Sequence, residues 1–436
     1  MLGKASARVS SRNLPIKASQ EGVQTKGEAM RRAYSLFAVW TLVLGWSVGA
    51  ANAEPAYGPG VTDREIKLGA NAPYSGPASI YASHPRTMLA YFAMLNEKGG
   101  INGRQVNLLT RDDAYSPPKT VEVIRSLVES DNVLAIMAPF GTPTNAAIQK
   151  YLNTNGVPQL LVQSGGTRWN DPKQYPWTTP YSPTYVNESR IIARYLLQTK
   201  ADAKVGVLLQ ADDIGKDFLL GLKEGLGAKS DSMIVKEASY QTTEPTIDSQ
   251  IVNLKASGAD TILIAAQNKF ASMAIRKIHE LGWKPLIFLG STANSVSGVL
   301  APAGLEASIG VLTTTSYKTP NDQNWANDKG MTDYLAFMAK YLPAQDPNDV
   351  IAVTGYTTAQ LGAIILERCG NSVTRENVLK QATNLKGIEL PMLLPGISIQ
   401  TTPDDYAAIT QRQFARFDGK TWVLFGNIIG AGAGKG

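Results

Sequence analysis

The chain has 436 residues, of which 44% are hydrophobic and 18% are charged, a balance that excludes both a disordered chain and a fibrous one. Its formal net charge is +6, but the first 53 residues hold seven Lys and Arg against two Glu, which leaves 35 Lys and Arg and 34 Asp and Glu in the remainder. A body so close to neutral excludes a nucleic-acid partner as the default interpretation.

The N-terminal segment has the three parts of a secretory signal. Two arginines at residues 31–32 precede an apolar run over residues 33–46, and small residues ending at Ala53 follow it. The run is short for a membrane span of about 20 residues, so we expect cleavage after Ala53 rather than a retained anchor. The start codon stays open between Met1 and Met30. No later segment is expected to cross a membrane, so the sequence predicts a secreted, soluble chain.

Beyond the leader, short strands alternate with amphipathic helices. The expected strands are 65–70, 106–109, 133–138, 158–162, 204–210, 233–237, 261–265 and 286–289. The expected helices cover 88–95, 116–128, 144–152, 186–197, 216–226, 246–256 and 270–281. Because the pattern restarts after Pro180, we expect an α/β protein of two doubly wound parallel-sheet lobes. Ligands bind beyond the carboxyl ends of such strands, so we expect the site between the lobes, in the loops that follow them.

The sequence contains no arrangement of residues that is typical of catalysis. His84 and His279 are isolated and too few for an ordinary zinc site, and neither a G-x-S-x-G elbow nor a phosphate-binding loop occurs. The acidic pairs Asp112–Asp113 and Asp212–Asp213 follow strands, as loop entries and helix caps do. We therefore expect a binding protein and not an enzyme, with no catalytic residue, no metal and no cofactor.

An ordered series of segments resembles the branched-chain amino-acid-type periplasmic binding proteins, in particular the subgroup that binds aromatic acids. The segments are Ala72–Pro77, Leu95–Gly103, Arg111–Asp113, Gly156–Pro158, Tyr240–Gln250, Leu254–Asp260, Ala274–Lys277, Leu281–Trp283 and Leu390–Gly396. The resemblance covers essentially all of residues 58–426. It implies the type I bilobed fold, a periplasmic location, and the role of solute-binding receptor for the membrane permease of an ABC importer. We also expect a monomer.

The resemblance further implies three crossings between the lobes, near Pro180, Ile309 and Pro395. Lobe one is then expected to comprise residues 58–180 and 310–395. Lobe two is expected to comprise residues 181–309 and 396–430, and residues 1–53 form the leader.

In the resembled family, hydroxyls and backbone N–H groups of lobe-one loops hold a ligand carboxylate. The matching positions here are Thr142, at the start of the helix that follows Phe140 and Gly141, and the loop of Gln163, Ser164, Gly165, Gly166 and Thr167. Amides at a helix N-terminus and in a glycine loop attract an anion without a formal positive charge. The same glycines also suit a tight turn.

The departures from the family pattern concern the ligand's other end. No carboxylate occurs in Leu289–Ser297, where family members that bind amino acids place an acid against the ammonium group. Two lobe-two tyrosines are replaced by Ile214 and Gln267, and the family's disulfide positions hold Tyr115 and Gly141. An enclosed ammonium without an opposing charge is costly, so an α-amino acid is disfavoured unless Asp212 or Asp213 supplies the charge.

Aromatic rings and neutral hydrogen-bonding groups remain near the expected site, and such a wall suits an aromatic or hydrophobic carboxylate. These are Tyr74, Tyr81, Phe140, Tyr181, Tyr185 and Ile214, with Gln267, Thr292 and Asp212 facing the ligand from lobe two. Three alternatives stay open: a receptor for aliphatic or branched-chain amino acids or amides, a ligand-sensing module of a signalling receptor, and a secreted enzyme.

Overall fold

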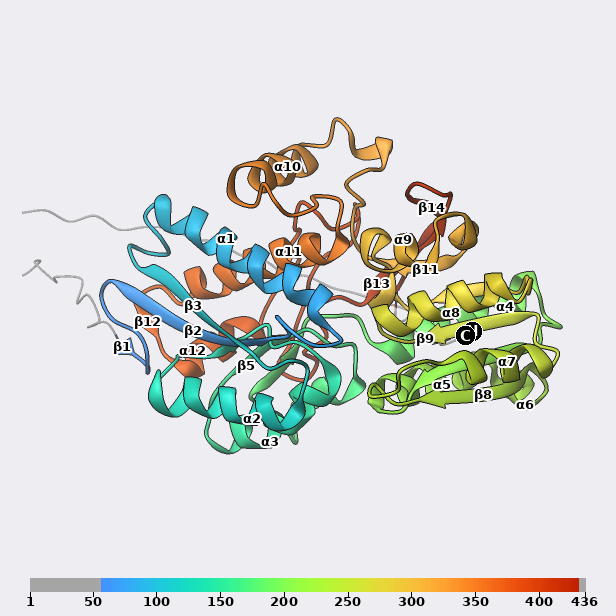
Figure 1. The fold of residues 1–436 in the computed structure, drawn as a ribbon. Coiled ribbons are helices and arrows are strands. Elements are labelled where there is room, and N and C mark those ends of the chain that lie inside the picture. Colours follow the sequence, from blue (N-terminus) through green and yellow to red (C-terminus); the bar gives the residue numbers. More distant parts are fainter. Residues whose placement is uncertain (1–55, 431–436) are drawn as a thin grey trace, which may run out of the picture. The chain divides into compact units, whose positions relative to one another are not determined.

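A computed structural model describes residues 56–430, in which helices cover two large β-sheets (Figure 1). We call the body around the five-stranded sheet lobe one and the body around the seven-stranded sheet lobe two. The N-terminal leader, its cleavage position and the start codon all lie outside the described residues.

Lobe one contains five parallel strands. In spatial order they are β3 (Gln105–Asp112), β2 (Glu65–Ala72), β4 (Ile136–Met137), β5 (Gln159–Val162) and β6 (Thr178–Pro180). The helices that cover them are α1 (Ser83–Glu97) and α11 (Val350–Arg368) on one face, and α2 (Pro117–Arg125) and α3 (Thr142–Thr154) on the other (Figure 1). The parallel order brings the carboxyl ends of the strands, and the loops after them, to one edge.

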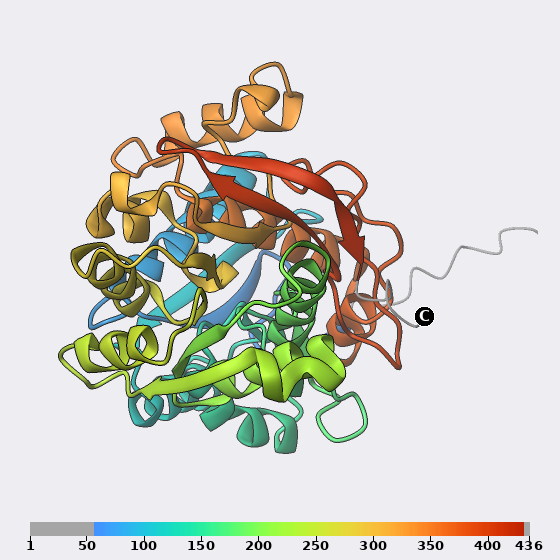
Figure 2. The same ribbon diagram turned by 90° about the vertical axis from the view of Figure 1, so that its right-hand side faces the viewer.

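Lobe two contains seven strands. In spatial order they are β14 (Trp422–Gly430), β13 (Gln411–Phe417), β11 (Leu312–Thr315), β10 (Leu286–Leu289), β9 (Thr261–Ala265), β7 (Val205–Gln210) and β8 (Ile234–Tyr240). The last five of these are parallel, whereas β13 and β14 form an antiparallel hairpin at the sheet's edge, drawn in red in Figure 2. The covering helices are α4 (Tyr185–Thr199) and α5 (Asp213–Leu226) on one face, and α7 (Asp248–Ala256) and α8 (Asn268–Glu280) on the other.

The remaining elements are short or peripheral. The strands β1 (Ala56–Tyr57) and β12 (Ser372–Val373) pair with each other. The further helices are α6 (Ser230–Met233), α9 (Ala301–Ala303), α10 (Lys329–Tyr341) and α12 (Arg375–Ala382). The short turns of helix are η1 (Ser79–Ala82), η2 (Ser126–Ser130), η3 (Thr167–Trp169), η4 (Gly227–Lys229), η5 (Ser291–Ala293), η6 (Val296–Leu300), η7 (Glu306–Ser308) and η8 (Gln323–Trp325).

Two of the three chain crossings lie later than the sequence led us to expect. The first follows Pro180, at the end of β6. Strand β11 still pairs within the lobe-two sheet, so the second crossing follows Thr315 and not Ile309. Ile397, Ile399, Ala408 and Ile409 pack into the lobe-one core, so the third crossing comes just before Gln411 and not near Pro395.

The alternation of strands and helices agrees with the sequence in order, although several elements differ in extent. The strand expected over residues 133–138 is reduced to Ile136–Met137. The loop expected over residues 210–215 is cut short because α5 begins at Asp213. The helix begins there because the Asp212 carboxylate accepts a hydrogen bond from the Ile214 backbone N–H at 2.8 Å, which caps its first turn.

Helix α11 corrects one expectation about the membrane. By length and composition it is long and apolar enough to cross a bilayer, which we expected of no segment after the leader. Yet 72% of its apolar window is buried, and Ala359, Leu361 and Ile365 lie in the lobe-one core, as in the core helix of a folded protein. Cys369 follows the helix and is also buried, and burial raises the pKa of its thiol to about 12, which leaves the thiol unreactive.

Candidate functional site

A cavity of about 130 Å³ lies between the lobes, at the carboxyl ends of their strands. Among the expected site residues, those that line it are Tyr81, Phe140, Gly141, Thr142, Gln163, Ser164, Gly165, Tyr185, Gln267 and Thr292. Those that do not line it are Gly166, Tyr181, Asp212 and Ile214. The fold therefore brings together most of a set whose members are far apart in sequence.

The lobe-one wall is built on the first turn of α3. Thr142 is the first residue of this helix, and its hydroxyl lies 2.7 Å from the Ser164 hydroxyl and 3.4 Å from that of Tyr185. The indole N–H of Trp169 donates to the Ser164 oxygen at 2.8 Å, which fixes that side chain. Two buried hydroxyls at a helix N-terminus, where backbone N–H groups lack helical partners, form a neutral place for an anion.

Gly165 allows lobe one to approach the first crossing closely. A Cβ atom at this position would lie 2.6 Å from the Pro183 carbonyl oxygen and 2.6 Å from the Tyr185 ring. Gly141 has a φ of 100°, and a Cβ there would lie 2.6 Å from the Tyr115 ring. Tyr115 and Gly141, at the positions of the family's disulfide, are therefore neighbours in space.

Aromatic rings face the cavity and connect the lobes. The ring centroids of Tyr81 and Phe140 are 4.5 Å apart. The Tyr81 hydroxyl lies 2.7 Å from the Thr292 carbonyl oxygen of lobe two and 3.1 Å from Asn268 Oδ1, and its one proton serves one of them. Gln267 of lobe two likewise donates its amide N–H to the Tyr115 hydroxyl. Burial raises the pKa of Tyr81, so the phenol stays neutral.

His84 also lines the cavity, although no sequence pattern predicted it there. Its side chain is buried, and Nε2 lies 3.3 Å from the Thr358 hydroxyl. That hydroxyl donates to the Thr354 carbonyl and accepts from Gln163, so it is available to His84 as an acceptor. Burial lowers the pKa of His84 to about 3, so the imidazole is neutral near pH 7.

Tyr181 and Ile214 were expected at the site but belong to the protein core. Tyr181 is fully buried in lobe one, where its hydroxyl donates to Thr357 at 2.7 Å. Ile214 lies in the first turn of α5 and packs in the same hydrophobic core as Phe218. Tyr74 likewise uses its hydroxyl within lobe one, where it donates to Thr110 at 2.8 Å.

The two aspartates that we considered as partners for a ligand ammonium do not line this cavity. Asp212 lines a separate hollow with Tyr115, and besides capping α5 it accepts from the Gln210 amide at 2.6 Å. Burial raises the pKa of Asp212, in part offset by that hydrogen bond. Asp213 pairs with Arg168 at 3.0 Å. Among the described residues, none that lines the cavity between the lobes is an Asp or a Glu.

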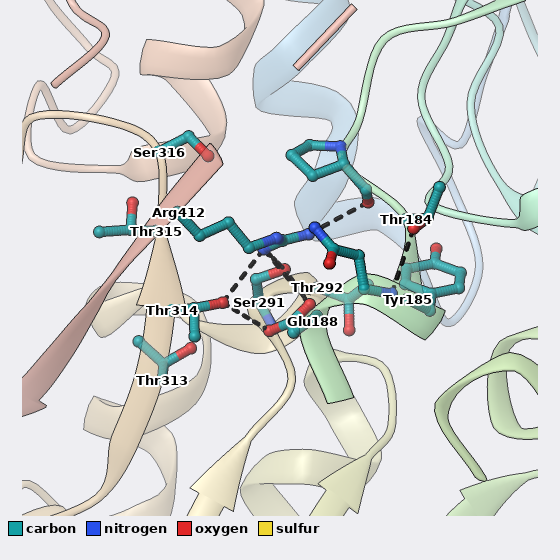
Figure 3. A network of polar contacts seen from close by, with 12 residues as sticks. Thr184, Tyr185, Glu188, Ser291, Thr292, Thr313, Thr314, Thr315, Ser316 and Arg412 are labelled. Carbon is teal, nitrogen blue, oxygen red and sulfur yellow. Dashed lines mark hydrogen bonds and ion pairs between the residues drawn. The ribbon is translucent and has the colours of Figure 1, made fainter. Parts of the chain in front are cut away.

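The lobe-two wall holds a charge that sequence analysis missed. Arg412, on β13, lines the cavity, although the expected site had no formal positive charge. Its Nη1 lies 3.3 Å from Oε2 of Glu188, which comes from α4 and does not line the cavity (Figure 3). The Glu188 carboxylate also accepts hydrogen bonds from Ser291 N at 2.7 Å and Thr314 Oγ1 at 3.0 Å. The Glu188 carboxylate thus lies close to Ser291 without lining the cavity, and Arg412 neutralises its charge.

One signal in the sequence could have revealed Arg412. Strand β13 reads Gln-Arg-Gln-Phe-Ala-Arg-Phe, and period-two alternation puts Arg412 on the same face as Phe414. Both are buried. A charged residue in phase with the buried face of a strand requires a partner, and that requirement marks it as a residue to examine.

The described residues contain no group of three or more His, Cys, Asp or Glu side chains that could hold a metal ion. The cavity offers hydroxyls, amides, aromatic faces and one neutralised arginine. These groups bind and orient a guest, and the fold and the cavity together define a bilobed α/β binding protein.

Comparisons with known proteins agree with this class. The sequence matches the family described as "Periplasmic binding protein" over residues 65–421, and the chain belongs to that family. Among curated relatives, the Leu/Ile/Val-binding protein homolog 2 of Brucella abortus is 24% identical over 251 residues, a match that covers 56% of this chain and 66% of the relative.

Solved structures show the same type I periplasmic-binding-protein fold. A branched-chain amino acid ABC transporter protein from Thermus thermophilus with bound valine has a TM-score of 0.76 at 16% identity and covers 85% of this chain and 97% of its own. The solute-binding protein of an ABC transporter from Rhodopseudomonas palustris BisB5, in complex with 3,4-dihydroxybenzoic acid, has a TM-score of 0.70 at 19% identity, with coverages of 85% and 98%.

Proposed function

We propose that this chain is the extracytoplasmic solute-binding receptor of an ABC importer and that it captures a small carboxylate, an aromatic or hydrophobic acid, between its lobes. Family membership supports the receptor class. The observation that carries the ligand class is the lobe-one wall, where the Thr142 and Ser164 hydroxyls meet at the start of α3 beside the Tyr81 and Phe140 rings. The permease of the importer then recognises the closed, liganded form.

The size and polarity of the cavity support a compact ring-sized guest. An apolar cavity of ~150 Å³ in another protein holds one benzene molecule, and the cavity here has about 130 Å³. The Thr142 end of the cavity suits a carboxylate because helix N-termini stabilise negative charge. An ammonium group would lack an acidic partner, since no described residue of the cavity wall is an Asp or a Glu.

Titration calorimetry of the purified chain tests the proposal. Benzoate and 4-coumarate are expected to bind at least tenfold more tightly than leucine or valine. Native mass spectrometry of the protein as purified would identify a retained guest. Tight binding of leucine with no response to aromatic acids would contradict the ligand class and leave the receptor class standing.

A receptor for branched-chain amino acids is the second candidate, because curated relatives carry the name Leu/Ile/Val-binding protein homolog. It needs an acid that reaches the ligand's ammonium group. Asp212 is the acid that the sequence suggested for this role. It lines a separate hollow, so it would have to move to reach the ligand's ammonium group. Loss of leucine binding in Asp212→Asn, with benzoate inactive in the native chain, would favour this second function.

A substitution of Thr142 tests whether its hydroxyl binds the carboxylate of the ligand. Replacement of Thr142 by Val keeps the shape of the side chain and removes its hydroxyl, so we expect binding of benzoate to weaken by about 1–3 kcal/mol. Thr144→Val is the matched control, because Thr144 lies on the same helix turn, directs its hydroxyl to the Phe140 carbonyl and does not line the cavity. Equal losses in the two variants would indicate that the helix start, and not the Thr142 hydroxyl, matters for binding.

A further inference from the structure

Arg412 is held at the cavity by groups of lobe two that lie beside the crossings, and by one group of the first crossing. Its Nη2 donates to the carbonyl of Pro183 in the first crossing at 3.1 Å. Its Nη1 donates to the Thr314 hydroxyl, just before the second crossing, at 3.2 Å, and to the Ser291 hydroxyl at 2.8 Å (Figure 3). Arg412 itself follows the third crossing directly. The guanidinium is therefore fixed by lobe-two groups together with the Pro183 carbonyl of the first crossing.

The two charges of the Glu188–Arg412 ion pair lie at different distances from the cavity, with the cation at its wall. Glu188 is fully buried and does not line the cavity, whereas Arg412 lines it and is 3% exposed. Both carboxylate oxygens of Glu188 are occupied, Oε1 by the Ser291 N–H and the Thr314 hydroxyl, and Oε2 by the Ser291 hydroxyl and Arg412. The pair thus presents its cationic member to the guest and keeps its anionic member behind the wall.

The guanidinium also lacks one acceptor. Arg412 Nε is buried and has no hydrogen-bond partner among the described residues. A buried N–H donor of a charged group without an acceptor is unfavourable, and buried polar groups are almost always paired. The neighbouring wall adds neutral hydroxyls, those of Thr315 and Ser316, and no acid. A guest with an acceptor oxygen on this side supplies what the wall lacks.

We propose that Arg412 is a specificity-determining ligand contact, and that the guest carries a second acceptor oxygen (a hydroxyl, carbonyl or second carboxylate) besides the carboxylate held at Thr142. This inference rests on the proposed function and narrows it to oxygen-substituted acids. Arg412 then discriminates among acids of similar size, because a guest without the second oxygen leaves the buried guanidinium underpaired.

Calorimetric titration with benzoate, 3- and 4-hydroxybenzoate and benzene-1,4-dicarboxylate tests the inference. The native chain is expected to bind at least one of the substituted acids tenfold or more tightly than benzoate. In Arg412→Gln this preference is expected to fall below threefold. Equal affinities of the native chain for all four acids, or a preference that survives in the variant, would overturn it.

The Arg412→Gln variant alone leaves the Glu188 charge buried without a partner and is at risk of unfolding. The double variant Glu188→Gln with Arg412→Gln removes both charges together, so neither is left buried without a partner, and the preference can be measured in a neutral wall. A matched control is Lys318→Gln with Asp328→Asn, which neutralises another ion pair, at 2.7 Å, outside the cavity. The control is expected to retain the tenfold preference.

The same titrations separate the two proposals. If benzoate binds and the double variant keeps the preference of the native chain, Arg412 is not the specificity contact and the proposed function stands. If none of the four acids binds to the native chain, the proposed function and this inference both fail.

Discussion

The two walls of the cavity solve the problem of burying polar groups in different ways. The lobe-one wall uses neutral groups close together in sequence, at the start of α3 and in the loop after β5, and backbone geometry positions them. The lobe-two wall depends on the buried Glu188–Arg412 ion pair and on groups bonded to it that come from distant parts of the chain. Glu188 is 103 positions from Ser291 and 126 positions from Thr314. Loss of one partner in the first wall removes a neutral hydrogen bond, whereas loss of one partner of the ion pair in the second leaves a buried charge uncompensated.

The largest expected effect follows from removing one partner of the lobe-two pair. Glu188→Ala leaves Arg412 charged and uncompensated in the interior, so we expect a loss of about 3–5 kcal/mol in the free energy of unfolding. Urea denaturation measures it. Asp213→Ala is the control, because it breaks the partly exposed Arg168–Asp213 pair and is expected to cost ~1 kcal/mol or less. Similar losses in both variants would remove the distinction between the walls.

The contrast between the walls also explains what the sequence could predict. Thr142, Ser164 and Gly165 were found because each follows a strand end and matches a family motif over a few consecutive residues. No short motif contains Glu188 and Arg412, which meet only because the third crossing returns the chain to the lobe-two sheet. Residues 396–430 were assigned to lobe two without a predicted strand, so Arg412 had no defined neighbour.

Tyr181 and Ile214 show the opposite failure. Each lies beside a strand end or a helix start, as ligand contacts do, and each faces the core. A shift of one position turns a side chain to the opposite face of a strand, or by about 100° around a helix, and sequence alone does not fix that phase at the end of an element. The order of strands and helices was predictable because it depends on the hydrophobic period of whole segments.

An intermediate effect is expected from His84 in the lobe-one wall. Burial lowers its pKa to about 3, against about 6.5 in an unfolded chain, so the unfolded state binds the proton more readily. This contribution to stability is complete above about pH 6.5 and is lost as the pH falls towards 3. At pH 5 the expected loss is about 2 kcal/mol.

Urea denaturation at pH 7 and pH 5 checks this prediction. His84→Asn removes the titrating group, so its loss of stability between the two pH values is expected to be smaller than that of the native chain by about 2 kcal/mol. His279→Asn, which replaces an exposed histidine, is expected to keep the native pH dependence. If His84→Asn keeps it as well, the neutral wall around His84 does not resist protonation as described.

The smallest expected effect concerns a contact that joins the lobes at the rim and not at the cavity. Asp217 of α5 accepts a hydrogen bond from the Thr167 backbone N–H of lobe one at 2.7 Å, and burial raises the pKa of Asp217 while this bond lowers it. Desolvation of Asp217 offsets much of the stabilisation that this hydrogen bond provides. Asp217→Asn is therefore expected to weaken benzoate binding by about 1 kcal/mol or less, at most about fivefold, because the lobes open more easily. Asp248→Asn, which alters a pair within lobe two, is expected to leave affinity unchanged. A loss as large as that of Thr142→Val would move the main determinant of affinity from the walls to the rim.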